Sequence, residues 1–154
     1  MSQTLERRSI LRFGFGSVAS AALLSFAPPA HAAPLKLRAE LKGSSEVPPN
    51  ETTGTGTVTV TFDPTTRRLT WDGTYSGLTG PATGAYFQGP AEPSKNAGVV
   101  VTITRATNQL KGSVTLTDTQ AVNLMLGHWY VNIYTDANKG GELRGQLVRM
   151  QVRN

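Results

Sequence analysis

The sequence predicts an all-β protein, an antiparallel Greek-key-like sandwich or flattened barrel of about eight strands with one short helix. Two observations lead to this prediction. Apolar and polar residues alternate one by one within short segments, which is the period of a half-buried strand. Gly, Pro, Asn and Asp separate these segments at short and regular intervals, as they do in hairpin-rich proteins.

The expected strands follow one another along most of the chain. In the first, Leu37 and Ala39 alternate with charged residues, and in the second Val58 and Val60 alternate with threonines. A Pro-containing turn at residues 63–67 then suits a hairpin. The expected strands cover residues 35–43, 56–64, 68–77, 83–89, 98–105, 109–117, 128–135 and 141–152.

One segment departs from the strand pattern. In "TDTQAVNLMLG", Thr117 or Asp118 can cap a helix that ends at Gly127. The apolar residues Ala121, Val122, Leu124 and Met125 follow at helical spacing. We expect this helix to cover the core, because a surface helix normally buries such a stripe within its own domain.

The first 32 residues have the pattern of an export signal. Arg7 and Arg8 precede an apolar stretch, and Ala30-His31-Ala32 forms an A-x-A cleavage pattern, so we expect cleavage after Ala32. The paired arginines resemble a twin-arginine signal, although a general secretory signal would look similar. The apolar stretch is short for a membrane anchor. The sequence therefore predicts a periplasmic or secreted protein without a transmembrane segment after cleavage.

The remaining residues, 33–154, have the length of a single domain. The chain contains no cysteine, which excludes disulfides and thiol chemistry. Its net charge is +5, and Arg67-Arg68 is the main basic cluster of residues 33–154, so nucleic-acid binding is disfavoured. No sequence feature points to a cofactor.

Three stretches of the chain carry a family resemblance. They include "EVPP" at residues 46–49, "YVNIYT" at 130–135 and "GGELRGQL" at 140–147. In this order and spacing they resemble the CHRD domain, first described in chordin and widespread in exported bacterial proteins, over residues 35–147. The resemblance implies an all-β fold and an extracytoplasmic location. It implies no reaction, because the family has no settled biochemical activity.

The chain departs from the family at three positions. Members commonly carry a His-x-His before the Gly-Pro and a third His in the "YVN" strand, whereas this chain has Tyr86, Gln88 and Tyr134. Three histidines on neighbouring strands could bind zinc or copper. Tyrosine and glutamine are poor replacements for them. We therefore predict no metal site here.

The alternation of side chains along the two strands predicts a different role for Tyr86, Gln88 and Tyr134. Trp129, Val131 and Ile133 form the uniformly apolar side of their strand and should face the core, together with Ala85 and Phe87. The opposite side then carries Tyr86, Gln88, Asn132 and Tyr134. If the two strands are adjacent, these four residues form an aromatic and amide surface suited to a sugar, a peptide or a partner domain. The simpler alternative is that the two tyrosines pack as a cross-strand pair that stabilises the sheet.

The last expected strand carries a second candidate. Glu142 and Arg144 lie two residues apart on one side of it, so they could form a half-buried ion pair, with Glu46 as another partner for Arg144. Glu142 could also act as an acid or base, but the sequence offers neither a matched second carboxylate nor a nucleophile beside a histidine. We assign no catalytic residues.

Two function classes remain open. The first, which we favour, is a non-catalytic exported module that binds an unknown protein, polymer or small-molecule ligand. The alternative is a metal-binding or redox-related periplasmic protein whose usual histidine site is altered in this chain. The sequence leaves the ligand and the oligomeric state open.

Overall fold

The computed structural model describes residues 32–103 and 108–151, which belong to one compact unit, His31–Asn154. Residues 1–31 of the predicted export signal, which ends at Ala32, lie outside the described residues. Among the residues that the structure describes, no helix has the length and apolar character that crossing a membrane requires.

The structure confirms the all-β fold class. Its strands are β1 Leu35–Lys42, β2 Thr55–Asp63, β3 Arg68–Ser76, β4 Ala82–Gln88, β5 Val99–Thr102, β6 Gln109–Thr115, β7 Tyr130–Thr135, β8 Leu143–Gln146 and β9 Val148–Arg149. The last expected strand is thus divided in two. At the break, the N–H of Leu147 donates to the carbonyl of Trp129, 2.9 Å away, and β9 then pairs with β1.

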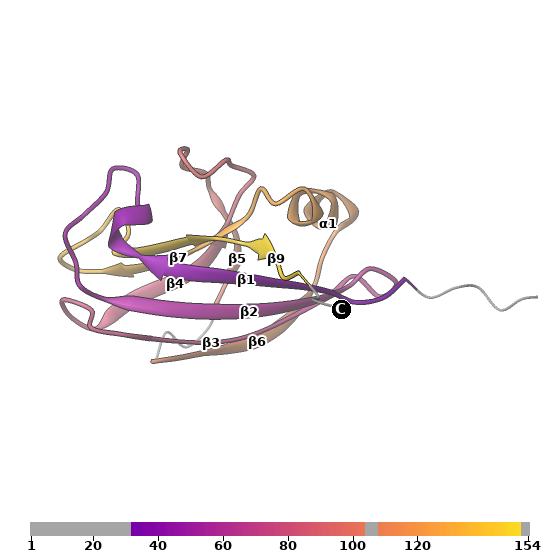
Figure 1. Ribbon diagram of the computed structural model, residues 1–154, viewed down its shortest axis with the longest axis horizontal. Helices are drawn as coiled ribbons and strands as arrows, with labels where there is room; N and C mark the ends of the chain where they lie inside the picture. The colour runs from indigo at the N-terminus through magenta and orange to yellow at the C-terminus, as the bar shows by residue number, and fades with distance from the viewer. Residues whose placement is uncertain (1–31, 104–107, 152–154) are drawn as a thin grey trace, which may run out of the picture. The chain divides into compact units, whose positions relative to one another are not determined.

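All the strands belong to one antiparallel sheet. Its order is β5-β4-β7-β8-β1-β2-β3-β6, with β9 paired to β1 beside this path. The sheet curls so that its two halves pack on each other, as Figure 1 shows. Side chains join the halves inside: the rings of Trp71 on β3 and Phe87 on β4 meet edge to face with centroids 5.2 Å apart. This is the flattened, open barrel that the sequence predicts.

The core is formed by the side chains on the inner side of each strand, which the alternation of apolar and polar residues predicts to be buried. Trp129, Val131 and Ile133 are fully buried in it, as predicted, and so are Ala85 and Phe87. β1, β2 and β3 contribute their alternate apolar residues to the same core. Burial of these side chains is the main stabilising contribution, because each large apolar side chain removed from water contributes about 1.5–3 kcal/mol.

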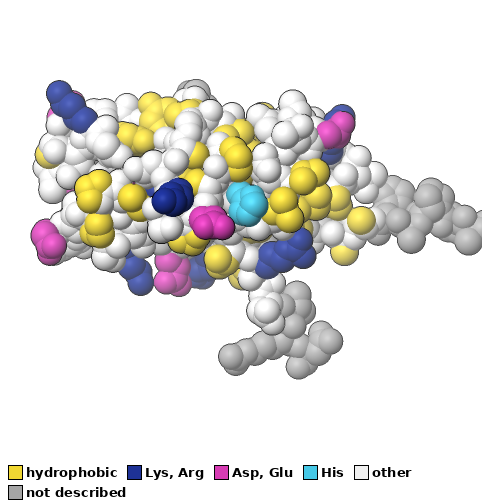
Figure 2. Space-filling model, turned by 90° about the horizontal axis from the view of Figure 1, so that it is seen from above, with side chains coloured by type: hydrophobic (Ala, Val, Ile, Leu, Met, Phe, Trp, Pro, Cys, Tyr) yellow, Lys and Arg dark blue, Asp and Glu magenta, His cyan; other side chains and the backbone are white. Residues whose placement is uncertain are grey.

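The expected helix is α1, Asp118–Met125. Thr117 is its N-cap and forms a capping box with Gln120. Ala121 and Leu124 are buried in the core, which confirms the covering role for these two residues. For Val122 and Met125 that prediction is wrong, because their exposed fractions are 50% and 36%. Figure 2, which views the unit from above Figure 1, shows hydrophobic side chains reaching the surface in several groups.

The outer side of the curled sheet has two regions that differ in what lies over them. On β4, β7 and β8, the segment 43–50, which contains the 3-10 turn η1 (Gly43–Ser45), and the segment 89–98 pack over the outward side chains. We call this region the loop-covered face. On β1, β2, β3 and β6 every outward side chain is exposed or half-buried, and we call this region the open face.

Candidate functional site

Six of the seven predicted site residues come together on or against the loop-covered face. In the register of β4 and β7, Tyr86 lies opposite Asn132. In the register of β7 and β8, Asn132 lies opposite Arg144. Gln88, Tyr134 and Glu46 complete the group, with Glu46 reaching in from the end of η1. The two strands are therefore adjacent, as the predicted surface required.

The two tyrosines and Gln88 form one contact cluster. The rings of Tyr86 and Tyr134 meet edge to face, with centroids 5.4 Å apart, and Gln88 Nε2 donates to Tyr134 Oη at 2.9 Å. The contact of the simpler alternative, a packed tyrosine pair, is thus present. Gly84 makes room for it, because a Cβ there would collide with the ring of Tyr86. Burial raises the pKa of Tyr134, so its hydroxyl remains a neutral donor and acceptor.

Glu46 and Asn132 form the most buried polar contact of this face. Glu46 is 4% exposed and Asn132 1% exposed, and Asn132 Nδ2 donates to Glu46 Oε2 over a long 3.4 Å. Burial raises the pKa of Glu46 to about 7, although the charge of Arg144 and the hydrogen bond from Asn132 act in the opposite direction. Glu46 therefore carries a proton through much of the range below neutral pH.

The remaining oxygens of these two side chains have no hydrogen-bond partner. Glu46 Oε1 and Asn132 Oδ1 are both buried and unpaired, and so is Gln88 Oε1. The first two oxygens lie close together against Gly141, where an added Cβ would be 2.6 Å and 2.5 Å from them. Gly141 also has a φ of +123°, so only glycine fits this position. Buried acceptors without donors are uncommon in proteins, and the proton that Glu46 carries below about pH 7 can supply the donor between these two oxygens.

Arg144 fastens the covering segment 89–98 to the strands. The guanidinium is 1% exposed and lies 3.6 Å from the ring centre of Tyr130. It donates to Asn96 Oδ1 at 2.7 Å and to the carbonyl of Lys95 at 2.6 Å. Tyr130 Oη in turn accepts from the N–H of Ala97 at 2.9 Å. These bonds hold the segment in one position over the sheet.

The predicted ion pair between Glu142 and Arg144 is wrong. Among the described residues no ion pair joins Arg144 to Glu142 or to Glu46. Both Glu142 and Arg144 are fully buried, at 0% and 1% exposure, instead of half-buried. Their side chains lie two residues apart on one side of the strand, but each is satisfied by a different loop.

Glu142 belongs to the end of the sheet. Its Oε1 accepts from Thr52 Oγ1 at 2.8 Å and from the N–H of Thr79 at 2.7 Å. Its Oε2 accepts from Thr79 Oγ1 at 2.7 Å and from Thr135 Oγ1 at 2.6 Å. Burial raises the pKa of Glu142, but these hydrogen bonds outweigh it and lower the pKa to about 2. Glu142 is therefore an ionised carboxylate that joins the loops at Thr52 and Thr79 to the end of β7, with its acceptors already occupied.

A pocket of about 450 Å³ opens between the two covering segments. Its lining residues are Ser44, Ser45, Glu46, Val47, Pro49, Pro93, Ser94, Arg144 and Gln146. Gln146 donates from Nε2 to the carbonyls of Ala91 and Gly127, while its Oε1 is buried and unpaired. Two of the unpaired acceptors of this face, on Glu46 and Gln146, thus belong to residues that line one pocket.

Sequence reasoning did not select Gln146, Tyr130 or the serines of the pocket. A signal existed for Gln146, because it continues the alternation of Glu142 and Arg144 along the chain. For the serines there was none, since they lie in loops whose position depends on contacts with distant residues. Within the described part of the chain, no three His, Cys, Asp or Glu side chains are grouped so that they could hold a metal ion.

Comparison with known proteins agrees with this architecture. The family model of the CHRD domain matches residues 37–147. The chain belongs to the CHRD domain family. The matched region runs from Leu37 in β1 through Leu147 and so contains the whole pocket and both outer faces except Lys36. No curated protein and no solved structure matches the chain.

Proposed function

We propose that this CHRD domain is an exported, non-catalytic binding module whose ligand enters the pocket between residues 44–49 and 93–94. The observation that supports this most strongly is Gln146 Oε1, an unpaired buried acceptor in a residue that lines the pocket. A ligand that donates a hydrogen bond would satisfy it. Leaving such groups unsatisfied costs about 1–3 kcal/mol each.

The chemistry of the lining indicates the class of ligand. Three serine hydroxyls and two acceptor side chains lie among the apolar surfaces of Val47, Pro49 and Pro93. Hydroxyl and amide groups on a compact, partly apolar body match this combination, as in a neutral sugar. The guanidinium of Arg144 is already bonded to Asn96 and Lys95, so its role is to keep the pocket wall in place.

Export is the second part of the proposal. The basic and apolar leader and the A-x-A pattern ending at Ala32 support it. We expect the purified protein from a cell envelope fraction to begin at Ala33. Replacing Arg7 and Arg8 by lysine should retain the precursor in the cytoplasm if the twin-arginine route is used.

Blocking the pocket tests the binding proposal. Ser94 is exposed at the rim, so Ser94→Trp fills the entrance without removing an internal contact. Ser113→Trp on the open face is the matched control. In titrations with neutral oligosaccharides followed by NMR, we expect shifts at residues 44–49 and 93–94 that Ser94→Trp abolishes and Ser113→Trp preserves. Failure of every oligosaccharide to shift these signals, or equal binding by Ser94→Trp, would contradict the proposal.

Direct metal analysis distinguishes the metal-dependent alternative from the proposed metal-free binding module. Stoichiometric zinc or copper in the protein purified from the cell envelope would overturn the preference for a metal-free binding module. A variant that restores histidine at positions 86, 88 and 134 is the informative comparison. Metal bound only by that variant would support the replacement of a family site by the tyrosine cluster.

A further inference from the structure

The open face is a regular polar array on four strands. Residues opposite one another in the strand register form rows across β1, β2, β3 and β6. The rows are Lys36–Thr61–Thr70–Ser113, Arg38–Thr59–Asp72–Lys111 and Glu40–Thr57–Thr74–Gln109, with Lys42–Thr55–Ser76 at one end. Neighbouring strands lie about 4.8 Å apart, so the array presents hydroxyl, amide and charged groups at close and even intervals.

The side chains of this array remain accessible. All of them are exposed or half-buried, and the exposed large hydrophobic residues of the described chain all lie on other elements. The open face is thus unsuited to an apolar partner and suited to a hydrophilic one.

Cations outnumber carboxylates on the open face. It carries five cations, Lys36, Arg38, Lys42, Arg68 and Lys111, and three carboxylates, Glu40, Asp63 and Asp72, of which Asp63 lies opposite Arg68. Two of the carboxylates form ion pairs with basic neighbours: Asp72 Oδ2 lies 3.2 Å from Lys111 Nζ, and the carboxylate oxygens of Glu40 lie 3.8 Å from Arg38 Nη2 and from Lys42 Nζ. The five cations and three carboxylates give this face a net charge of +2, and the whole chain has a net charge of +5.

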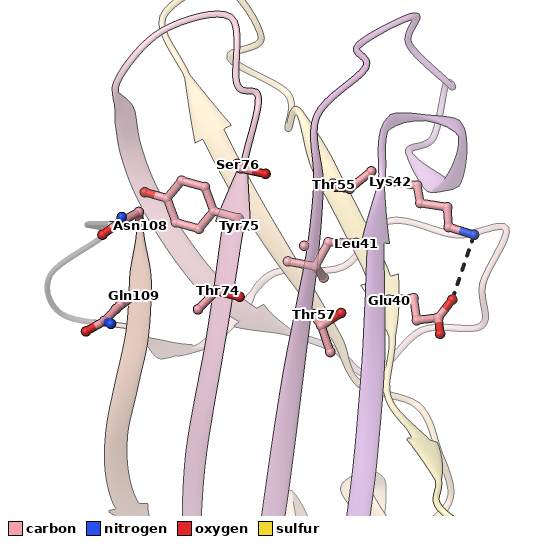
Figure 3. Close-up of a pocket in the computed structure, with 11 residues that line it drawn as sticks. Glu40, Leu41, Lys42, Thr55, Thr57, Thr74, Tyr75, Ser76, Asn108 and Gln109 are labelled. Carbon is pink, nitrogen blue, oxygen red and sulfur yellow. Dashed lines mark ion pairs between the residues drawn. The ribbon is translucent and has the colours of Figure 1, made fainter.

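Two hollows lie on these four strands. One, of about 500 Å³, is lined by Glu40, Thr57, Thr74 and Gln109 among others, and Figure 3 shows these side chains coming from four adjacent strands. The other, of about 460 Å³, is lined by residues that include Thr59, Arg68, Asp72 and Lys111. Since both belong to the same sheet region, a chain-like ligand could occupy both.

We propose that the open face binds an extended acidic polysaccharide, one that carries carboxylates spaced along a chain of hydroxyl-rich sugars. The cations are spread among threonine, serine and glutamine side chains, so a ligand with spaced charges and many hydroxyls complements them in both respects. Single-stranded nucleic acid fits less well, because its binding relies on exposed aromatic side chains that stack on bases. This surface is separate from the pocket of the proposed function.

The experiment uses full-length protein and polygalacturonate, with dextran as the uncharged comparison. Arg38→Gln combined with Lys111→Gln removes two charges from the open face. Lys95→Gln combined with Lys139→Gln removes two charges from exposed loop positions and is the matched control. Affinity electrophoresis at low and at high salt gives the dissociation constants.

We expect polygalacturonate to bind, dextran not to bind, and the open-face pair to weaken binding about tenfold, which corresponds to about 1.4 kcal/mol. The control pair should change the affinity by less than about twofold, and salt should weaken binding because the charges are exposed. Ser94→Trp should leave it unchanged, so that failure of the pocket proposal and of this one can be told apart. Absence of binding, an equal loss in both charge pairs, or tighter binding of single-stranded DNA would each overturn the proposal.

Discussion

The loop-covered face and the open face are two parts of the outer side of one curled sheet, yet a charged side chain is buried on the first and exposed on the second. Arg144 on the loop-covered face is 1% exposed, whereas the side chain of Lys111 on the open face is 81% exposed. Both residues occupy outward positions of a strand. The difference comes from segment 89–98, which covers Arg144 and supplies its hydrogen-bond acceptors. Burial of a charge on a sheet is thus decided by the loop that crosses it.

The two buried carboxyl groups extend this comparison within the covered region. Glu142 receives four hydrogen bonds and remains ionised, with its pKa lowered to about 2. Glu46 receives a long hydrogen bond from Asn132 and one from the backbone of Val47, and burial raises its pKa to about 7. Equal burial therefore leads to opposite protonation, depending on how many donors the surroundings provide.

The largest effect should come from removing the carboxylate of Glu142. Glu142→Ala leaves the hydroxyls of Thr52, Thr79 and Thr135 without their acceptor, and we expect a loss of about 4 kcal/mol in the free energy of unfolding. Glu40→Ala on the open face is the control and should cost less than about 0.5 kcal/mol. Urea unfolding measures both. A loss below about 1 kcal/mol for Glu142→Ala would mean that the loops do not depend on this residue.

The next effect concerns the attachment of the covering segment. Arg144→Met keeps the length of the side chain but removes its bonds to Asn96 and to the carbonyl of Lys95, and we expect a loss of about 3 kcal/mol. Hydrogen exchange at Ala97 should accelerate, because its N–H is held by Tyr130 in the same arrangement. Lys111→Met, the matched change on the open face, should not alter that exchange. Unchanged protection of Ala97 in Arg144→Met would refute the fastening role.

Glu46 should make stability depend on pH with the sign of a carboxyl whose pKa is raised on folding. The native protein holds this proton between about pH 4.5 and pH 7, where the unfolded chain has lost it, so stability falls as the pH rises through this window. The effect should be on the order of 2 kcal/mol. Glu142 has the opposite sign, and its contribution is lost as the pH falls from about 4.5 toward 2.

The variant Glu46→Gln separates the two carboxyls. It removes the titrating group at position 46, and thermal unfolding between pH 4.5 and pH 8 should then show a flatter profile than the unmodified protein. Loss of stability below pH 4.5 should persist, because Glu142 is still present. An unchanged slope in Glu46→Gln above pH 4.5 would show that another group causes it.

The smallest effect is expected for the ion pairs of the open face. Asp72 and Lys111 are 69% and 81% exposed at the side chain, so water screens their attraction. Asp72→Ala should change the free energy of unfolding by no more than about 0.5 kcal/mol, and salt should reduce even that difference. A double-mutant cycle with Lys111→Ala measures the coupling. A coupling above about 1 kcal/mol would contradict the description of this face as open.

Much of the site could be predicted residue by residue. The adjacency of Tyr86, Gln88, Asn132 and Tyr134 followed from parity once their strands were paired, and the structure has this pairing. The ion pair of Glu142 with Arg144 could not be judged in this way. The alternation of side chains along a strand places Glu142 and Arg144 on one side, but it does not determine which loops contact them. In the structure Thr79 donates to Glu142 and Asn96 accepts from Arg144, and both partners are distant in sequence.

The sequence by itself determined the all-β class, the inward stripe of Trp129, Val131 and Ile133, and the helix beginning after Thr117, because these depend on local periodicity and capping. Only the tertiary structure decided which outward side chains became buried, and so where Glu46 and Arg144 lie and where the pocket opens. The physical reason is that a strand's alternation separates its two sides, whereas the solvation of each side depends on segments remote in sequence that fold over it.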